Sequence, residues 1–239
     1  MPKLYDFKGG EVLLVDKPLE WTSFDVVNKL RYQLKQKTGI KRFKVGHAGT
    51  LDPLASGLLI LCCGKATKTI ESYMGMPKEY TGTIVLGASR PSYDMETEID
   101  HTFAISEITE ADVLKAVETF TGNIQQVPPL FSAKKIDGKK AYEYARKGVE
   151  KELKSNSITI YSYEITRMEL PEIDFKIQCS KGTYIRSLAH DLGTALNNGA
   201  YLKALRRTAI GDFKVTDAKS VNDWVNEIIT AEVVEESEN

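Results

Sequence analysis

A glycine-rich stretch of twelve residues constrains this chain more than any other part of its sequence. It reads Gly-His-Ala-Gly-Thr-Leu-Asp-Pro-Leu-Ala-Ser-Gly over residues 46–57, and the apolar run Leu-Leu-Ile-Leu-Cys-Cys follows at residues 58–63. Glycine permits tight turns and close backbone approaches, while Pro53 pushes Asp52 out of the helical region. The apolar run is typical of a buried strand. The pattern therefore predicts a stiff loop that presents Asp52 at the mouth of that strand; an ordinary Asp-Pro turn is the alternative.

Length and cysteine usage limit the class of protein. The 239 residues suffice for one large domain or two small ones, and either can bury a core. No apolar run has the length of a membrane span, and the N-terminus lacks the apolar segment of a signal peptide. Cys62, Cys63 and Cys179 have no C-x-x-C spacing, which argues against a disulfide framework or a zinc site. We therefore expect a cytoplasmic protein without a membrane partner.

The net charge of −1 conceals an uneven distribution of charge. Six acidic residues and no Lys or Arg follow Lys219, and subtracting them from the total leaves a formal charge of +5 on residues 1–219. A positive body with an acidic tail is compatible with a nucleic-acid partner. A solvated surface without a partner fits the charge equally well.

Hydrophobic periodicity predicts a mixture of strands and helices. The expected strands cover residues 11–15, 58–63, 78–87, 157–170, 173–179 and 201–210, and the expected helices cover 65–73, 109–120 and 221–229, with two more beginning after Thr22 and at Ile185. The Thr22 helix opens with a capping box to Asp25 and carries Phe24, Val27, Leu30 and Leu34 on one face. Because no regular βαβ repeat is visible, we expect an α+β fold with a largely antiparallel sheet flanked by helices. Residues 1–229 form one catalytic domain in this interpretation, and residues 230–239 a disordered acidic tail.

Residues 123–154 differ from their surroundings in charge. They hold eight Lys or Arg against four acidic residues, with Phe131, Tyr142 and Tyr144 interleaved. Basic residues with aromatics suit backbone contact and base stacking, so we interpret the segment as a mobile RNA-gripping insertion rather than a plain surface helix. Five further cations precede the glycine-rich loop and suit phosphates, although a solvated helix end would look similar: Lys35, Lys37, Lys41, Arg42 and Lys44.

The common cofactor motifs do not fit. Gly64-Lys65-Ala66-Thr67 resembles the end of a P-loop, but Leu59 stands where its first glycine is required and Ala66 replaces the magnesium-binding hydroxyl. A G-x-S-x-G elbow and a dinucleotide fingerprint are missing from the sequence. His47, His101 and His190 lack metal-ligand spacing. We therefore expect neither a metal nor a cofactor.

Six segments resemble, in order, the motifs of the tRNA pseudouridine-55 synthases, the TruB family. Residues 46–57 closely resemble the family's motif II, Asp16-Lys17-Pro18 is similar to motif I, and residues 179–188 (Cys-Ser-Lys-Gly-Thr-Tyr-Ile-Arg-Ser-Leu) are similar to motif III. Lys78-Glu79-Tyr80 matches the segment with the active-site tyrosine, and residues 142–148 (Tyr-Glu-Tyr-Ala-Arg-Lys-Gly) resemble the RNA-binding insertion. Residues 202–209, with Leu205-Arg206-Arg207, resemble the strand that closes the pocket.

The resemblance implies a pseudouridine-synthase fold and a cofactor-free isomerisation of uridine 55 in the T-loop of tRNA. It implies a flipped uridine, Asp52 as nucleophile at C1′ or on a glycal route, and Arg186 as the arginine fork that keeps the nucleophile ionised and aimed. Tyr80 is expected to stack on the flipped uracil and move a proton. The remaining expected site residues are the RNA-binding His47, Lys68, Lys139, Lys140, Arg146, Tyr184 and Leu205, and the supporting Lys17, Pro18 and Gly49. The partner is the T stem-loop of tRNA, without an obligatory protein partner, and we expect a monomer.

Two departures from the family pattern are visible. Bacterial members often carry a C-terminal PUA domain, which is not expected in residues 211–239. The loop over residues 89–98 keeps Asp94 but lacks the usual Thr and Asp pattern around it, so only Asp94 is carried over, weakly.

Three alternatives stay open at this stage. A guide-RNA-dependent relative of the dyskerin type shares motif II, but it expects protein partners and a PUA-like domain. A non-catalytic tRNA-folding chaperone would not need Asp52, Tyr80 and Arg186 together. A carboxylate glycosidase would want two catalytic acids, and only one lies in a motif here.

Overall fold

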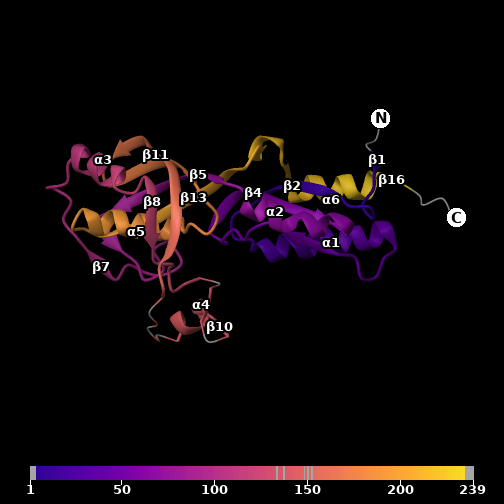
Figure 1. Ribbon diagram of the computed structural model, residues 1–239, viewed down its shortest axis with the longest axis horizontal. Coiled ribbons are helices and arrows are strands. Elements are labelled where there is room, and N and C mark those ends of the chain that lie inside the picture. The colour runs from indigo at the N-terminus through magenta and orange to yellow at the C-terminus, as the bar shows by residue number, and fades with distance from the viewer. Residues whose placement is uncertain are drawn as a thin grey trace. The chain divides into compact units, whose positions relative to one another are not determined.

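The structure is a computed structural model (Figure 1) that describes residues 4–132, 134–136, 138–147, 149, 151 and 153–234, and the backbone alone at 135, 136, 139 and 140. The chain divides into two compact units. The first unit comprises Met1–Lys78 and Arg206–Asn239, and the second comprises Glu79–Leu205. Each unit has its own hydrophobic core and is described by itself.

The first unit contains the chain segments around the glycine-rich loop. Its elements are β1 (Leu4–Tyr5), β2 (Val12–Lys17), α1 (Ser23–Thr38), β3 (Val45–His47), β4 (Ala55–Cys63), η1 (Gly64–Thr69), α2 (Ile70–Gly75), β14 (Phe213–Lys214), η2 (Val215–Asp217), β15 (Lys219–Ser220), α6 (Val221–Thr230) and β16 (Glu232–Val233). Strand β4 pairs antiparallel with both β2 and β3. Eight of its nine residues, including all of the apolar run 58–63, are buried, which confirms the predicted buried strand.

Helix α1 begins and ends at strong local signals. Thr22 and Asp25 form the predicted capping box, and Gly39 ends the helix at a left-handed φ of 71°. Val26, Val27, Leu30 and Leu34 are buried against a core that also contains α6. Burying one such side chain stabilises the fold by about 1.5–3 kcal/mol.

The prediction that Phe24 shares this buried face is wrong. Its side chain is 60% exposed, and the guanidinium of Arg31 lies 6.0 Å from its ring. At 100° per residue, Phe24 lies one position outside the stripe that runs from Ser23 through Val26 and Val27 to Leu30.

The second unit is a sheet covered by helices. Its elements are β5 (Lys78–Leu86), β6 (Ala88–Ser89), β7 (His101–Thr102), α3 (Glu110–Glu118), β8 (Gly122–Gln126), β9 (Lys135–Ile136), β10 (Lys139–Lys140), α4 (Ala141–Ala145), β11 (Asn156–Glu169), β12 (Glu172–Cys179), α5 (Ile185–Ala195) and β13 (Ala200–Ile210), the last of which ends in the first unit. The strand order is β13-β5-β12-β11-β8, and β11 pairs antiparallel with β12 and β8.

Helices α3 and α5 cover this sheet. Val113 and Val117 of α3 and Leu188 and Leu192 of α5 belong to one buried cluster with side chains of β5, β11 and β12. Mixed strands and helices with mainly antiparallel pairing confirm the predicted α+β fold. The prediction of a single catalytic domain over residues 1–229 is not tested by the division into compact units.

The structure describes parts of both segments that the sequence singled out, the basic insertion at residues 123–154 and the acidic tail at residues 230–239. Strand β8 belongs to the sheet, so the segment that leaves it starts after Gln126 and returns at Asn156. At the C-terminus, β16 pairs with β1 and the Val234 N–H donates to the Tyr5 carbonyl, so the described fold extends into the predicted tail. Residues 235–239 of that tail lie outside the described residues. Within the described part of the chain, no helix is long and apolar enough to cross a membrane.

Candidate active site

Asp52 lies in the first unit, on the connection between β3 and β4. The backbone turns there, since the Ala55 N–H donates to the Asp52 carbonyl at 3.1 Å. Asp52 itself is partly exposed, whereas Leu51 before it is buried. A turn at the start of β4 therefore carries the Asp52 carboxylate. That this loop presents Asp52 for reaction stays a prediction.

Ser23 anchors the residue before Asp52. Its buried hydroxyl accepts from the Leu51 N–H at 2.8 Å and donates to the Leu51 carbonyl at 3.1 Å. Ser23 is the first residue of α1, where the helix start fixes its position. Both polar groups of Leu51 are thus satisfied by one side chain 28 residues earlier in the sequence.

Lys17 anchors the residue after Asp52. Its amine is fully buried and donates to the carbonyls of Pro18 and Trp21 at 2.8 and 2.6 Å, with a longer contact to the Pro53 carbonyl at 3.5 Å. The Pro53 carbonyl also accepts from the Glu20 N–H at 2.8 Å. Burial lowers the pKa of Lys17 to about 8, against the opposing effect of the Asp52 carboxylate.

Arg207 supports the loop from a third direction. Its guanidinium, 1% exposed, donates to the carbonyls of Leu58, Thr50 and Gly49 at 2.7, 3.4 and 3.2 Å. Sequence reasoning gave this residue no role. The sequence could have indicated it, because Arg206 and Arg207 are adjacent in a strand. Successive side chains of a strand point to opposite faces, so one of the two arginines must face the interior.

Arg206, the neighbouring arginine, points to a different partner. It makes a two-pronged ion pair with Asp16, at 3.0 and 2.7 Å, beside the Ser56 hydroxyl. Asp16 belongs to the predicted motif I and Ser56 to motif II, so β13 ties these two segments together within the first unit.

The other predicted residues of the first unit surround the loop. His47 ends β3, and its Nδ1 is buried without a hydrogen-bond partner in the described structure. Burial, and then the nearby Arg207 charge, lower the pKa of His47, which favours the neutral ring. Gly49 has a φ of 104°, a conformation that favours glycine. Lys68 is exposed on η1, and Pro18 is exposed after β2.

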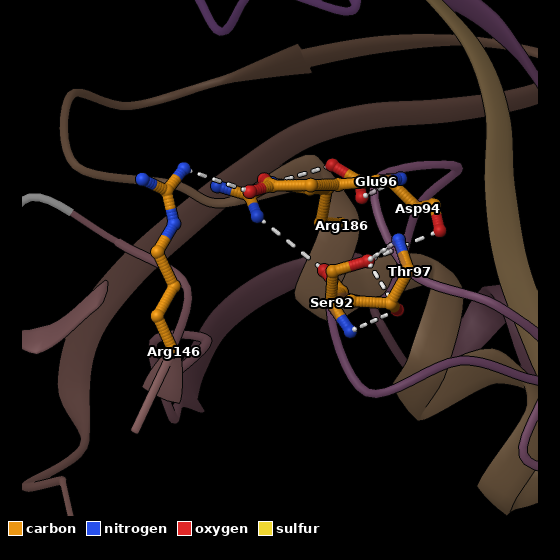
Figure 2. Close-up of polar contacts among 6 residues, drawn as sticks. All are labelled: Ser92, Asp94, Glu96, Thr97, Arg146 and Arg186. Carbon is orange, nitrogen blue, oxygen red and sulfur yellow. Dashed lines mark hydrogen bonds and ion pairs between the residues drawn. The ribbon is translucent and has the colours of Figure 1, made fainter. Parts of the chain in front are cut away.

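Arg186 lies in the second unit, in the first turn of α5. It is only 5% exposed and is therefore a buried charge rather than a surface charge. Figure 2 shows its guanidinium between Ser92 and Asp94: Nη1 donates to the Ser92 carbonyl at 3.3 Å, and Nε lies 3.5 Å from Asp94 Oδ2. A buried guanidinium needs such compensation, because an unpaired buried charge is strongly destabilising.

The aromatic residues predicted for the site belong to the second unit as well. Tyr80 on β5 and Leu205 on β13 are partly buried against its core. Tyr184 lies at the N-terminus of α5. The side chain of the buried Gln126 hydrogen-bonds to both the N–H and the carbonyl of Tyr184. The Tyr184 N–H donates to Gln126 Oε1 at 2.8 Å and Gln126 Nε2 donates to the Tyr184 carbonyl at 3.0 Å. Sequence reasoning missed Gln126.

The predicted RNA-gripping segment is described in part. Lys139 and Lys140 form β10, which pairs with β9, and their side chains lie outside the described structure. Arg146 is ion-paired with Glu96 at 3.2 Å and lies over the Tyr142 ring at 5.3 Å. The Arg146 side chain is 66% exposed, so this ion pair is a weak surface pair.

The predicted site residues thus fall into two sets. Asp52, His47, Lys17, Pro18, Gly49 and Lys68 belong to the first unit, and Tyr80, Tyr184, Arg186, Leu205, Arg146, Lys139 and Lys140 to the second. Their roles in catalysis and RNA binding stay predictions. Among the described residues, no group of three or more His, Cys, Asp or Glu side chains is arranged to hold a metal ion.

Comparisons with known proteins agree with the predicted resemblance. Residues 35–185 match the sequence model of the TruB family pseudouridylate synthase N-terminal domain, and residues 186–237 match that of the tRNA pseudouridylate synthase B C-terminal domain. The chain is 56% identical over 214 residues to the tRNA pseudouridine synthase B of Flavobacterium johnsoniae, covering 89% of this chain and 93% of the relative. It is 52% identical over 234 residues to that of Phocaeicola vulgatus, covering 97% and 100%.

A solved structure supports the fold. In the crystal structure of a Cbf5-Nop10-Gar1 complex, one chain superposes with a TM-score of 0.70 at 29% identity, over 92% of this chain and 54% of that chain. This chain therefore spans about half the length of that structural relative.

Proposed function

The chain belongs to the TruB family of pseudouridylate synthases, and we propose that it isomerises uridine 55 in the T-loop of tRNA to pseudouridine. The observation that carries the proposal is the anchoring of the two residues that flank Asp52. Ser23 holds Leu51, and the Glu20 N–H, with a longer contact from Lys17, holds the Pro53 carbonyl. Positioned functional groups are what catalysis requires of a scaffold, and loops held by rigid elements commonly supply them. Relatives at 50–56% identity carry the name tRNA pseudouridine synthase B.

The reaction needs no atom from outside the substrate except a proton exchanged with water. The N1–C1′ bond breaks, the detached uracil rotates, and a C5–C1′ bond forms; C5 then loses its proton and N1 gains one. In this proposal Asp52 is the nucleophile, at C1′ or on the glycal route, since carboxylates act as nucleophiles at sugar carbons. Arg186 is the arginine that aims this nucleophile in the proposal.

Base flipping precedes the chemistry in this proposal. A uridine inside a folded loop is stacked, and an enzyme that acts on it must extrude it. Tyr80 stacks on the flipped uracil and moves a proton, Tyr184 and Leu205 line the pocket, and His47 takes the vacated position. Phosphate contacts from Lys68, Lys139, Lys140 and Arg146 supply most of the affinity.

Position mapping tests the proposal. A full-length tRNA transcript is incubated with the purified chain alone, treated with carbodiimide and read by primer extension. We expect one primer-extension stop, which maps the modification to position 55, and no stop with a transcript that carries cytidine there. Stops that map only to other positions would reject the assignment, and so would the absence of any stop when the tRNA is bound.

The same experiment separates a second candidate, a guide-dependent pseudouridylase. That candidate is favoured by the structural similarity to a chain of the Cbf5-Nop10-Gar1 complex. Modification by the purified chain, without a guide RNA or another protein, supports a stand-alone enzyme. Modification that requires added partners supports the second candidate. As a stand-alone tRNA-modifying enzyme, the protein is proposed to act in the cytoplasm.

A further inference from the structure

The loop between β6 and β7 departs from the family pattern, yet it is tightly built. Ser92 and Thr97 bind each other reciprocally: each N–H donates to the other's hydroxyl, at 3.1 and 3.2 Å, and the two hydroxyls lie 2.9 Å apart. The Glu96 N–H donates to Asp94 Oδ1 at 2.9 Å (Figure 2). Ser92 is fully buried. These contacts fix two groups that contact Arg186, the Ser92 carbonyl and the Asp94 carboxylate.

Tyr93 lies between these two groups in a conformation that bulky residues rarely adopt. Its φ is +64°, in the left-handed region. Its ring stacks on His190 with centroids 4.0 Å apart and planes 13° apart. Its carbonyl accepts from the Leu202 N–H at 2.9 Å. Unfavourable backbone geometry that surrounding contacts maintain is often associated with a functional site.

His190, on which the Tyr93 ring stacks, belongs to α5, the helix that carries Arg186. His190 follows Arg186 by four residues on α5, so both side chains leave the same face of the helix, one turn apart. Arg186 meets Ser92 and Asp94, and His190 meets Tyr93 between them. The loop is therefore fastened to α5 at three consecutive residues.

We propose that Tyr93 is a positioning residue for Arg186, acting through its stack on His190. The stack holds the loop against α5, so that Ser92 and Asp94 grip the guanidinium in one orientation. The inference rests on the proposed function, which gives Arg186 its catalytic role. The proposal gives Tyr93 a role within residues 89–98, the loop in which this sequence departs from the family pattern.

Paired variants test the proposal. Tyr93→Leu and His190→Leu each remove the stack from one side, whereas Tyr93→Phe keeps a ring that can stack. Tyr161→Leu, at a tyrosine that is 52% exposed on β11, is the matched control. We expect the single-turnover rate to fall on the order of 10²-fold in both stack-removing variants, because small misplacements of catalytic groups have effects of this size. The tRNA Kd, the Tyr93→Phe rate and the control rate stay at the wild-type level.

Two further readouts separate positioning from general destabilisation. In an Arg186→Lys background, Tyr93→Leu should add little further loss, since residues that act as a unit are not additive. The ¹⁵N resonance of Arg186 Nε, identified by its absence in Arg186→Lys, should shift in Tyr93→Leu and His190→Leu and remain in place in Tyr93→Phe.

An unmoved Nε resonance overturns the proposal, and so does an undiminished rate in a folded Tyr93→Leu or His190→Leu. A fully additive loss on Arg186→Lys overturns it too. The wild-type rate is measured in parallel, and an inactive wild type rejects the proposed function instead. The resonance test applies in either case.

Discussion

Single contacts hold the backbone around Asp52 in place. Ser23 satisfies both polar groups of Leu51, and without it a buried N–H and a buried carbonyl lose their only side-chain partner among the described residues. An unsatisfied buried polar group costs roughly 1–3 kcal/mol. A shift of the peptide before Asp52 relieves that cost and misplaces the proposed nucleophile, so stability and rate are linked in this proposal.

Ser23→Ala should therefore slow turnover more than it weakens binding. We expect the single-turnover rate to fall about 10- to 100-fold, as for misplaced catalytic groups, with the tRNA Kd nearly unchanged. Ser220→Ala is the control, since Ser220 caps α6 in the same unit by accepting from the Asp223 N–H at 3.1 Å. The control should cost about 1 kcal/mol of unfolding free energy and leave the rate unchanged. Equal rates for Ser23→Ala and wild type would contradict the account.

Asp191 makes the stability of the fold depend on pH. Burial raises its pKa to about 6, above the ordinary value of 3.8. The folded state then holds a proton that the unfolded state loses, so this contribution to stability is present below pH 4 and is lost as pH rises through 6. Asp191→Asn removes that loss.

Urea unfolding from pH 4.5 to 7.5 measures the effect. The free energy of unfolding of Asp191→Asn, relative to wild type, should rise with pH and level off above about 6, where the wild-type group is ionised. A flat difference for Asp191→Asn would show that Asp191 titrates normally.

At the residue scale, the sequence marks the loop that carries the proposed nucleophile, Asp52, better than it marks the side chains that support this loop. The Pro53 and glycine pattern is local, so the loop and Asp52 were predictable. Ser23, Gln126 and Arg207 act on residues 28, 58 and at least 149 positions away, and nothing local marks such pairs. The resemblance to a family named Arg186 but not the Tyr93–His190 stack, which lies where this sequence departs from that family.

Among the elements, β4 and β13 approach closely at Gly57. Gly57 has a φ of 106°, and an added Cβ would lie 2.3 Å from the Arg207 carbonyl oxygen. Gly39, at the end of α1, also has a positive φ of 71° but open space around it. An alanine at Gly39 would therefore meet backbone strain alone, whereas an alanine at Gly57 would meet backbone strain and a collision with β13.

Gly57→Ala should destabilise the protein more than Gly39→Ala. We expect about 1–2 kcal/mol for Gly39→Ala from the left-handed backbone alone. For Gly57→Ala we expect roughly 2–5 kcal/mol, because the collision with β13 adds about 1–3 kcal/mol. Urea denaturation gives both values, and an equal cost would mean that β13 moves aside freely.

The basic segment after β8 should act on binding rather than on chemistry. Charge reversal at Lys139 and Lys140 should weaken tRNA binding and reduce the slope of log Kd against log salt by about 1 per lost phosphate contact. Lys115→Glu, at an exposed position of α3, is the control. A salt series with unchanged affinity for the double variant would remove these lysines from the RNA-binding surface.

Most elements could be predicted from periodicity, since α1, β4 and α5 each show a clear apolar pattern and α1 also begins at a capping box. Phe24 shows the limit of that method, because a hydrophobic residue one position off the stripe looks similar in sequence but faces outward. The pairing of β16 with β1 joins the two ends of the chain, and no short-range pattern contains that information.

For the whole molecule, two compact units carry complementary parts of the predicted chemistry. The first contains the nucleophile and its rigid support; the second contains the arginine, the aromatic residues and the basic segment. Membership of the TruB family connects these parts to one reaction. The central claim is that Asp52 performs that reaction without help from a metal ion.

Tritium release tests this claim most directly. A tRNA transcript labelled at C5 of uridine is incubated in chelator with wild type, Asp52→Asn or the exposed control Asp212→Asn, while binding is measured in parallel. Wild type and the control should release the label at the same rate, and Asp52→Asn should bind tRNA normally but release none. Release by Asp52→Asn, or none from a wild type that binds tRNA, would contradict the account.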